Sequence, residues 1–202
     1  EKRNIKAETM QEFQLGFAED NWTGLGNFLH KEGFPEDQVK LSGLIKRSEY
    51  KNSYYDLFRN RIMFPILHYN GDVVGFGGRV LNDDMPKYLN TPETEIFSKR
   101  KTLYGLYQAR DFIRQANEVI LVEGYLDCIK LYQANIKNVV ASLGTAFTRE
   151  QAQLLGRYAE EIVILYDGDE AGQRETLRAL DILTAEGFNV FVVTLPGGKD
   201  PD

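Results

Sequence analysis

The sequence predicts an α/β protein in which a four-strand, mainly parallel sheet with flanking helices follows a smaller subdomain of mixed helices and strands. Two observations carry this prediction. After residue 117, four short apolar runs are each separated from the next by helical sequence, as in a parallel sheet whose strands are buried on both faces. Before residue 117, the pattern is short helices, a hairpin and a polar loop. We therefore divide the chain into residues 1–116 and 117–202.

In the first part, apolar spacing predicts helices, and two apolar runs predict a β-hairpin. The helices are expected at 9–17, 24–31 and 103–115, and the hairpin at 61–81. Asn70-Gly71 separates the two runs of the hairpin, and this dipeptide favours a tight turn. The glycine cluster at 75–78 lacks the dinucleotide-binding fingerprint, so we interpret it as a bulge or a close approach of another backbone or a ligand. Residues 82–102 are expected to form a loop that carries basic side chains.

In the second part, strands and helices alternate. Strands are expected at 119–122, 139–143, 162–166 and 190–195, with helices at 126–134, from 148 onward and at 170–185. Thr148 and Gln151 have the spacing of a capping box at the start of the second helix. Gly187 is placed to end the third.

Composition limits the classes of protein to consider. The chain has 202 residues, 43% of them hydrophobic, which suffices for one large or two small domains. It begins at Glu1, which suggests an excised piece, and it contains neither a signal-peptide pattern nor an apolar run of about 18 residues. The single cysteine, Cys128, excludes an internal disulfide and a cysteine zinc cluster, and we expect it in the core. His30 and His68 are interpreted as structural or surface residues.

Charge is unevenly distributed along the chain. The net charge of −6 is unusual for an enzyme that acts on nucleic acid. Residues 79–115 carry seven basic and five acidic side chains, net +2, whereas residues 118–202 carry seven basic and fourteen acidic ones, net −7. Many of these acidic residues are expected to be a solvated surface. The remainder would need cations nearby.

Carboxylates follow three of the four expected strands. Glu123 follows the first strand, Asp167 and Asp169 follow the third, and Asp200 and Asp202 follow the fourth. Parallel strands end at one edge of the sheet, where open α/β sheets bind ligands. Two such charges about 4 Å apart repel by about 4 kcal/mol at an effective dielectric of 20. Because oxygen-only ligands favour Mg²⁺ or Mn²⁺, the pattern predicts a divalent-metal site for phosphate chemistry.

Three other interpretations of Asp167–Gly172 fit the sequence less well. An EF-hand loop needs an acidic ligand at its twelfth position, where this chain has Arg178, and a liganding residue where it has Ala171. An aspartyl-nucleophile phosphatase also expects Thr or Val at Ala171. A purely structural interpretation makes Asp169 the N-cap of the following helix. It explains one aspartate well but not carboxylates at three strand ends.

At these residues the sequence resembles a known family. Glu123-Gly124 and Asp167-x-Asp169 on a four-strand α/β unit resemble the TOPRIM domain, which primases, type IA and type II topoisomerases and some nucleases share. Further segments resemble bacterial DnaG-type DNA primase, in the same order and over most of the chain from about residue 12. They are RNRIMFPI (59–66), GFGGRVL (75–81), PKYLNTPET (86–94), FSKRKTLYG (97–105), LVEGYLD (121–127), ASLGTAFT (141–148), YDGDEAG (166–172) and DPD (200–202).

The resemblance implies a DNA-dependent RNA polymerase that synthesises short RNA primers on single-stranded DNA by two-metal nucleotidyl transfer. It assigns catalytic roles to Glu123, Asp167 and Asp169, with Glu123 also able to handle the hydroxyl proton. The implied ligands of two or more Mg²⁺ or Mn²⁺ ions are Glu123, Asp167, Asp169, Asp200 and Asp202. Asp127 is expected to orient the site from outside the ligand set.

The resemblance also implies residues that bind ribonucleoside triphosphates or the template. Arg79, Lys87 and Lys99 match basic positions of the family, and cations are what phosphates require. Weaker candidates are Arg61, Asn90, Lys101 and Arg110. Tyr88 and Tyr104 are candidates either for base stacking or for packing between the two subdomains.

The family's zinc-binding domain and its carboxyl-terminal helicase-binding domain do not occur in this sequence. We therefore expect no zinc, no membrane partner, a cytoplasmic location at the bacterial replication fork, and contact with the replicative helicase only through a domain absent here. The TOPRIM domain is expected to be truncated, with Asp200 and Asp202 at a frayed end. Divalent-ion binding but little or no primer synthesis is expected of the fragment alone.

Two alternatives remain open. One is another TOPRIM enzyme, a topoisomerase or nuclease; a topoisomerase would need a nucleophilic tyrosine in a separate domain and would leave residues 59–105 unexplained. The other is a non-catalytic module that binds nucleic acid.

Overall fold

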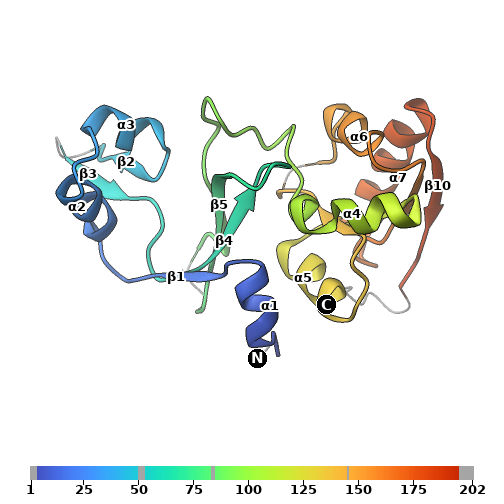
Figure 1. Cartoon of the computed structure of the whole chain (residues 1–202), viewed down its shortest axis with the longest axis horizontal. Helices are drawn as coiled ribbons and strands as arrows, with labels where there is room; N and C mark the ends of the chain where they lie inside the picture. The colour runs from blue at the N-terminus through green and yellow to red at the C-terminus, as the bar shows by residue number, and fades with distance from the viewer. Residues whose placement is uncertain (1–3, 50–52, 83–84, 145, 196–202) are drawn as a thin grey trace. The chain divides into compact units, whose positions relative to one another are not determined.

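The computed structural model describes residues 4–49, 53–82, 85–144 and 146–195 (Figure 1). The chain forms two compact units. The larger unit comprises Glu1–Phe13, Leu67–Asp72 and Lys99–Asp202, and the smaller unit comprises Gln14–Ile66 and Val73–Ser98. These units are defined by which residues contact one another in space. The division of the chain between residues 116 and 117, which the sequence pattern predicts, stays a prediction.

The larger unit contains the predicted parallel sheet. Its strands lie in the order β10-β9-β7-β8, and every neighbouring pair is parallel. Their bounds are β7 Glu118–Val122, β8 Val139–Ala141, β9 Glu161–Ile164 and β10 Asn189–Val192. The α/β class and the parallel sheet expected from the alternating pattern are therefore confirmed.

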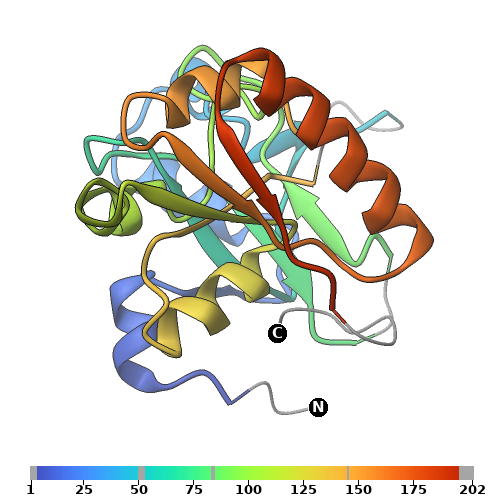
Figure 2. The same ribbon diagram turned by 90° about the vertical axis from the view of Figure 1, so that its right-hand side faces the viewer.

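Helices cover both faces of this sheet (Figure 2). They are α4 Leu106–Ala116, α5 Tyr125–Gln133, α6 Arg149–Leu155 and α7 Glu170–Ala185, and α1 Ala7–Glu12 also belongs to this unit. Side chains of α4, α6 and α7 share one buried core with Val119, Leu121, Ile162 and Ile164 of the strands. Figure 2 shows α6 and α7 on one face of the sheet and α5 on the other.

The helix ends follow local rules that the sequence displays. The Thr148 hydroxyl accepts a hydrogen bond from the Gln151 backbone N–H, and the Gln151 side chain accepts one from the Thr148 N–H, both at 3.1 Å. This is the predicted capping box of α6. Gly187 adopts a left-handed conformation, with φ 89°, immediately beyond α7. A glycine is favoured there because a side chain disfavours positive φ.

The smaller unit contains two antiparallel assemblies. A four-strand sheet has the order β1-β4-β5-β6, and a separate pair consists of β2 and β3. The bounds are β1 Gly16–Ala18, β2 Ile45–Arg47, β3 Tyr54–Asp56, β4 Arg61–Leu67, β5 Val73–Val80 and β6 Tyr88–Asn90, with helices α2 Gly24–Lys31 and α3 Glu36–Leu41. Strands β4 and β5 form the hairpin predicted at 61–81, and α2 has the predicted bounds.

Two details of this region differ from expectation. The helix predicted at 9–17 ends at Glu12, because Gln14 has φ 52° and Gly16–Ala18 pairs with β4 as a strand. The glycine cluster of β5 makes room for side chains. A Cβ atom on Gly78 would lie 2.7 Å from the Phe58 ring, and one on Gly75 would lie 3.2 Å from the Phe97 ring. Aromatic side chains occupy the space beside these two glycines.

Among the residues that the structure describes, no helix combines the length and apolar character that crossing a membrane requires.

The sheet core predicts a stability difference between two leucines of the larger unit. Leu121 of β7 is fully buried, whereas Leu177 of α7 is 63% exposed. Leu121→Ala should lower the free energy of unfolding by about 2–5 kcal/mol, because it removes buried methyl groups and leaves a cavity. Leu177→Ala is the matched control and should change it by about 0.5 kcal/mol or less. Urea unfolding followed by circular dichroism measures both, and equal losses would contradict this core.

Candidate metal centre

Two of the predicted acidic residues lie side by side at the carboxyl edge of the parallel sheet. Glu123 directly follows β7, and Asp167 follows the neighbouring strand β9 by three residues. The two strands pair in parallel, so their carboxyl ends adjoin. The backbone N–H of Asp167 donates a hydrogen bond to Oε1 of Glu123 at 3.2 Å. The structure thus brings these half-buried residues together across 44 positions of sequence.

This neighbourhood makes the Glu123 carboxylate costly to ionise. Burial raises the pKa of Glu123 to about 7, and the negative charge of Asp167 adds to the rise. The hydrogen bond from the Asp167 backbone acts in the opposite direction, and Asp127 and Asp169 contribute further repulsion. A cation bound here would favour the ionised carboxylate, because opposite charge offsets both effects.

Asp169 has a structural task in this arrangement. Its Oδ1 accepts a hydrogen bond from the backbone N–H of Gly172 at 2.8 Å, which makes Asp169 the N-cap of α7. The capping interpretation is therefore correct for this residue. A carboxylate has a second oxygen, and Asp169 is exposed, so capping and ion binding are compatible.

The predicted ligand set is only partly within the described chain. Asp200 and Asp202 lie outside the described residues. Across the described ranges, no group of three or more His, Cys, Asp or Glu side chains is arranged to hold an ion. The donors that do converge, Glu123 and Asp167 with Asp169 two residues further on, offer oxygen alone, which fits Mg²⁺ or Mn²⁺ better than zinc. The assignment of individual ligands stays a prediction.

Two glycines allow the helices to begin so close to these carboxylates. A Cβ atom on Gly172 would lie 2.2 Å from the Asp167 carbonyl oxygen and 2.9 Å from Glu123 Oε1. A Cβ atom on Gly124 would lie 2.8 Å from Asp127 Oδ2, which accepts a hydrogen bond from the Gly124 N–H at 3.0 Å. Asp127 therefore holds the turn that follows Glu123. Its expected role in orienting the site stays a prediction.

Four predicted nucleotide- or template-binding residues lie on the smaller unit. Arg79 of β5 pairs in register with Tyr88 of β6, and its guanidinium lies 5.6 Å from the Tyr88 ring centroid. Lys87 precedes β6 and is exposed, and Asn90 ends β6. Arg61 is 7% exposed, and its Nη1 donates to the Pro86 and Gly78 carbonyls at 2.8 and 3.5 Å. Arg61 thus ties the hairpin to the turn before β6.

The remaining basic candidates belong to the larger unit. Lys99 is half-buried, and its carbonyl accepts a hydrogen bond from Gln151 Nε2 at 3.0 Å. Arg110 donates a hydrogen bond to the Tyr69 carbonyl, and its guanidinium lies 4.6 Å from the Tyr107 ring centroid. Tyr104 is 1% exposed and stacks on Phe13, so it belongs to the core of this unit.

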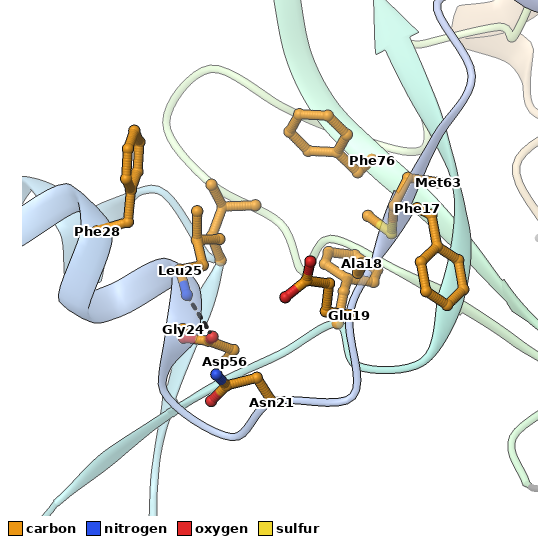
Figure 3. Close-up of a pocket in the computed structure, with 12 residues that line it drawn as sticks. Phe17, Ala18, Glu19, Asn21, Gly24, Leu25, Phe28, Asp56, Met63 and Phe76 are labelled. Atoms are coloured by element: carbon orange, nitrogen blue, oxygen red, sulfur yellow. Dashed lines mark hydrogen bonds between the residues drawn. The ribbon is translucent and has the colours of Figure 1, made fainter.

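Sequence reasoning missed two features of the smaller unit. One is a group of aromatic and basic side chains around Arg59, for which the interleaved segment YYDLFRNR (54–61) was a usable signal. The other is an apolar pocket of about 390 Å³ between α2 and the sheet, which Figure 3 shows in close-up. Asp56 at its edge accepts hydrogen bonds from the backbone N–H groups of Leu25 and Gly26. None of the predicted site residues lines this pocket.

Comparison with known proteins covers the whole chain. Residues 1–110 match the family described as DNA primase catalytic core, N-terminal domain, and residues 120–202 match one described as Toprim-like. The DNA primase of Clostridium acetobutylicum is 51% identical over 201 residues, which are 99% of this chain and 33% of that protein. The chain thus spans about a third of the length of the curated relatives it matches.

Solved structures agree with these matches. The zinc-binding and RNA polymerase domains of Aquifex aeolicus primase superpose with a TM-score of 0.91 at 40% identity, covering 98% of this chain and 49% of that one. A DnaG primase catalytic domain bound to single-stranded DNA superposes with a TM-score of 0.88 at 40% identity, covering 99% of this chain and 63% of that one.

The close approach of α7 predicts a strong effect of one methyl group. Gly172→Ala should lower the free energy of unfolding by about 1–3 kcal/mol and weaken divalent-ion binding, because the new Cβ atom collides with backbone atoms that cannot yield. Gly156→Ala, whose Cβ would meet nothing closer than 3.4 Å, is the matched control. Urea unfolding and calorimetric titration with Mn²⁺ measure the two effects. A stable, ion-binding Gly172→Ala variant would disprove the packing described.

The raised pKa of Glu123 predicts a pH-dependent stability. Because its folded-state pKa of about 7 exceeds the ordinary 4.5, the folded protein binds this proton more tightly than the unfolded chain does. The resulting stabilisation is complete below about pH 4.5 and is lost as the pH rises through about 7. Without divalent ions, Glu123→Gln should remove this part of the pH dependence, whereas the exposed control Glu160→Gln should retain it. Urea unfolding between about pH 5 and 8 tests it, and identical profiles for all three proteins would refute it.

Proposed function

The chain belongs to the bacterial DnaG-type DNA primase family, and from that premise we propose that it forms part of a primase catalytic core, which synthesises short RNA primers on single-stranded DNA. The observation that supports this proposal best is the meeting of Glu123 and Asp167 at the ends of adjacent parallel strands. Carboxylates that are forced together at such an edge are suited to hold divalent cations for phosphate chemistry.

In this proposal Mg²⁺ or Mn²⁺ is held by Glu123, Asp167 and Asp169, together with Asp200 and Asp202 beyond the described residues. Ions of this kind supply activation of an attacking hydroxyl and charge neutralisation on the leaving pyrophosphate. The protein contributes the placement of its carboxylates, since the Gly172 N–H holds Asp169 and the Asp167 N–H holds Glu123. We also assign to Glu123 the handling of the hydroxyl proton, as the family resemblance implies.

The basic side chains bind the phosphates of the nucleotide and the template. We assign phosphate contacts to Arg79, Lys87 and Lys99, because cations provide most of the affinity for a nucleic-acid backbone. Asn90 is assigned a polar contact next to them. Arg61 acts through its hydrogen bonds to the Pro86 and Gly78 carbonyls, which position Lys87 and the strand that carries Arg79.

The comparisons favour a primase over the alternatives. A topoisomerase or nuclease would share the Toprim-like match at 120–202, but the primase-specific match covers 1–110 as well. The proposed partners are ribonucleoside triphosphates, a single-stranded DNA template and, through a domain outside this sequence, the replicative helicase. We place this activity in the bacterial cytoplasm. We further propose that these 202 residues alone bind divalent ions but synthesise little primer, because they span about a third of the related primases.

A substitution that removes one negative charge with little change of side-chain shape tests the proposed chemistry. In the longer protein that contains this sequence, Asp167→Asn should reduce primer synthesis on the order of 100-fold or more, because it removes charge that holds the catalytic ions. Asp181→Asn, the same change at an exposed position of α7, should leave synthesis unchanged. Radiolabelled primer synthesis measures the rate, and calorimetry with Mn²⁺ shows whether ion binding falls in parallel.

The alternative of a non-catalytic module gives a different outcome. A non-catalytic module would keep its nucleic-acid binding and show no rate to lose. Undiminished primer synthesis by Asp167→Asn would refute the proposed role of this carboxylate.

A further inference from the structure

The basic side chains Lys99, Arg100 and Lys101 lie on a turn of the larger unit. Neither a helix nor a strand occurs between the end of β6 and the start of α4, a stretch that the structure describes completely. Regular backbone pairing therefore does not fix this turn, and other groups must bind its carbonyls. We call residues 99–102 the basic turn.

Gln151 of α6 binds both ends of the basic turn. Its Nε2 donates hydrogen bonds to the carbonyl of Lys99 at 3.0 Å and to the carbonyl of Thr102 at 2.8 Å. Gln151 is fully buried, with 0% of its surface exposed. Because a buried amide that loses its partners is more costly than an exposed one, these two bonds hold the turn firmly against the helix.

Thr148 binds the middle of the same turn. Its Oγ1 donates a 2.6 Å hydrogen bond to the Arg100 carbonyl. Arg100 also forms an ion pair with Glu150, with 3.4 Å between Nη2 and Oε1, but this pair lies at the surface and contributes little. Two side chains at the start of α6 thus bind three carbonyls of the basic turn.

The two hydrogen bonds from Gln151 to the basic turn exceed what the start of a helix requires. A capping box needs an acceptor on Thr148 and another on Gln151, and both acceptors are in place. Glutamate serves at the second position of such a box as well as glutamine does. A carboxylate, however, lacks the N–H donors that reach Lys99 and Thr102. The amide of Gln151 is therefore used for the basic turn as well as for the helix.

We propose that Gln151 and Thr148 are positioning residues for nucleotide binding, because they hold the basic turn in the arrangement in which Lys99 contacts the triphosphate. The inference rests on the proposed function, which assigns Lys99 a phosphate contact, and it adds two residues that act through the backbone. Ordering a flexible segment on binding lowers affinity, and a turn that is held beforehand avoids this loss. The start of α6 thus contributes to the affinity for nucleotide.

Substitutions that keep the helix cap but remove the donors test this proposal in the longer protein that contains the sequence. Gln151→Glu and Thr148→Asp retain the acceptors of a capping box, and neither carboxylate donates to the turn. Each should raise the KM for ATP in primer synthesis about three- to tenfold, as loss of one or two hydrogen bonds does, with kcat changed less than about twofold. Thr148→Ser keeps the hydroxyl and should retain the normal KM.

Two controls separate positioning from charge and from stability. Gln153→Glu makes the same chemical change at an exposed position of α6 and should leave KM unchanged. Leu155→Ala removes a fully buried side chain from the same helix. It should lower the melting temperature but leave KM unchanged when the rate is measured well below that temperature. A raised KM in either control would overturn the proposal, because charge or stability alone would then explain the effect.

A double-mutant cycle tests whether Gln151 acts through Lys99. In a protein that already carries Lys99→Ala, Gln151→Glu should raise KM by less than about twofold more, because the effects of coupled residues do not add. Full additivity of the two effects would overturn the proposal. So would an unchanged KM accompanied by weaker binding of a labelled single-stranded oligonucleotide, measured by anisotropy, because the turn would then serve the template.

The proposal can fail while the proposed function stands. A raised KM for Lys99→Ala together with a normal KM for Gln151→Glu would overturn the positioning role alone. A normal KM and kcat for Lys99→Ala would instead contradict the phosphate contact assigned to Lys99, and this inference with it. Circular dichroism shows whether each variant is folded. Thr148→Asp, at a position that is partly exposed, supplies the answer if Gln151→Glu does not fold.

Discussion

The parallel pairing of β7 with β9 is the constraint on which the candidate centre depends. It fixes the carboxyl ends of two strands as neighbours, and it thereby forces Glu123 against the backbone of Asp167. The fold tolerates the resulting crowding of negative charge in three ways. The Asp167 N–H donates to Glu123, α7 directs its N-terminal dipole toward the same place, and Glu123 binds a proton more readily than an ordinary glutamate. Each of these is a partial substitute for a cation.

The same contacts that form the fold also shape the site. Asp169 caps α7 with one oxygen, and Asp127 holds the turn between β7 and α5 through the Gly124 N–H. Gly172 permits α7 to start against the Asp167 carbonyl. Elements of secondary structure therefore fix the backbone on which these carboxylates stand.

Regular patterns in the sequence were sufficient for the larger unit. Buried strands such as β7 and β9 have strong apolar runs, and the rule for parallel sheets then places Glu123 beside Asp167. Features that depend on distant partners were not predictable. The partners that bury Arg61, the carbonyls of Gly78 and Pro86, lie 17 and 25 residues away. Likewise, the helix expected at 9–17 ends early because pairing with β4 makes 16–18 a strand. Local preference was outweighed in both cases by contacts that periodicity does not encode.

A net charge of −6 would argue against nucleic-acid binding if the net charge of the whole chain determined the interaction. A ligand instead responds to the charges near its binding site, because salt screens exposed charges that are more than about 8–10 Å away. In the smaller unit, the described residues around Trp22 include the cations Lys46, Arg59 and Arg61 and the acidic Asp20. The excess of acidic residues lies mainly in 118–202, where, in the proposed function, carboxylates at the sheet edge bind cations. A net charge of −6 therefore does not argue against the proposed function, because basic and acidic side chains are concentrated in different parts of the chain.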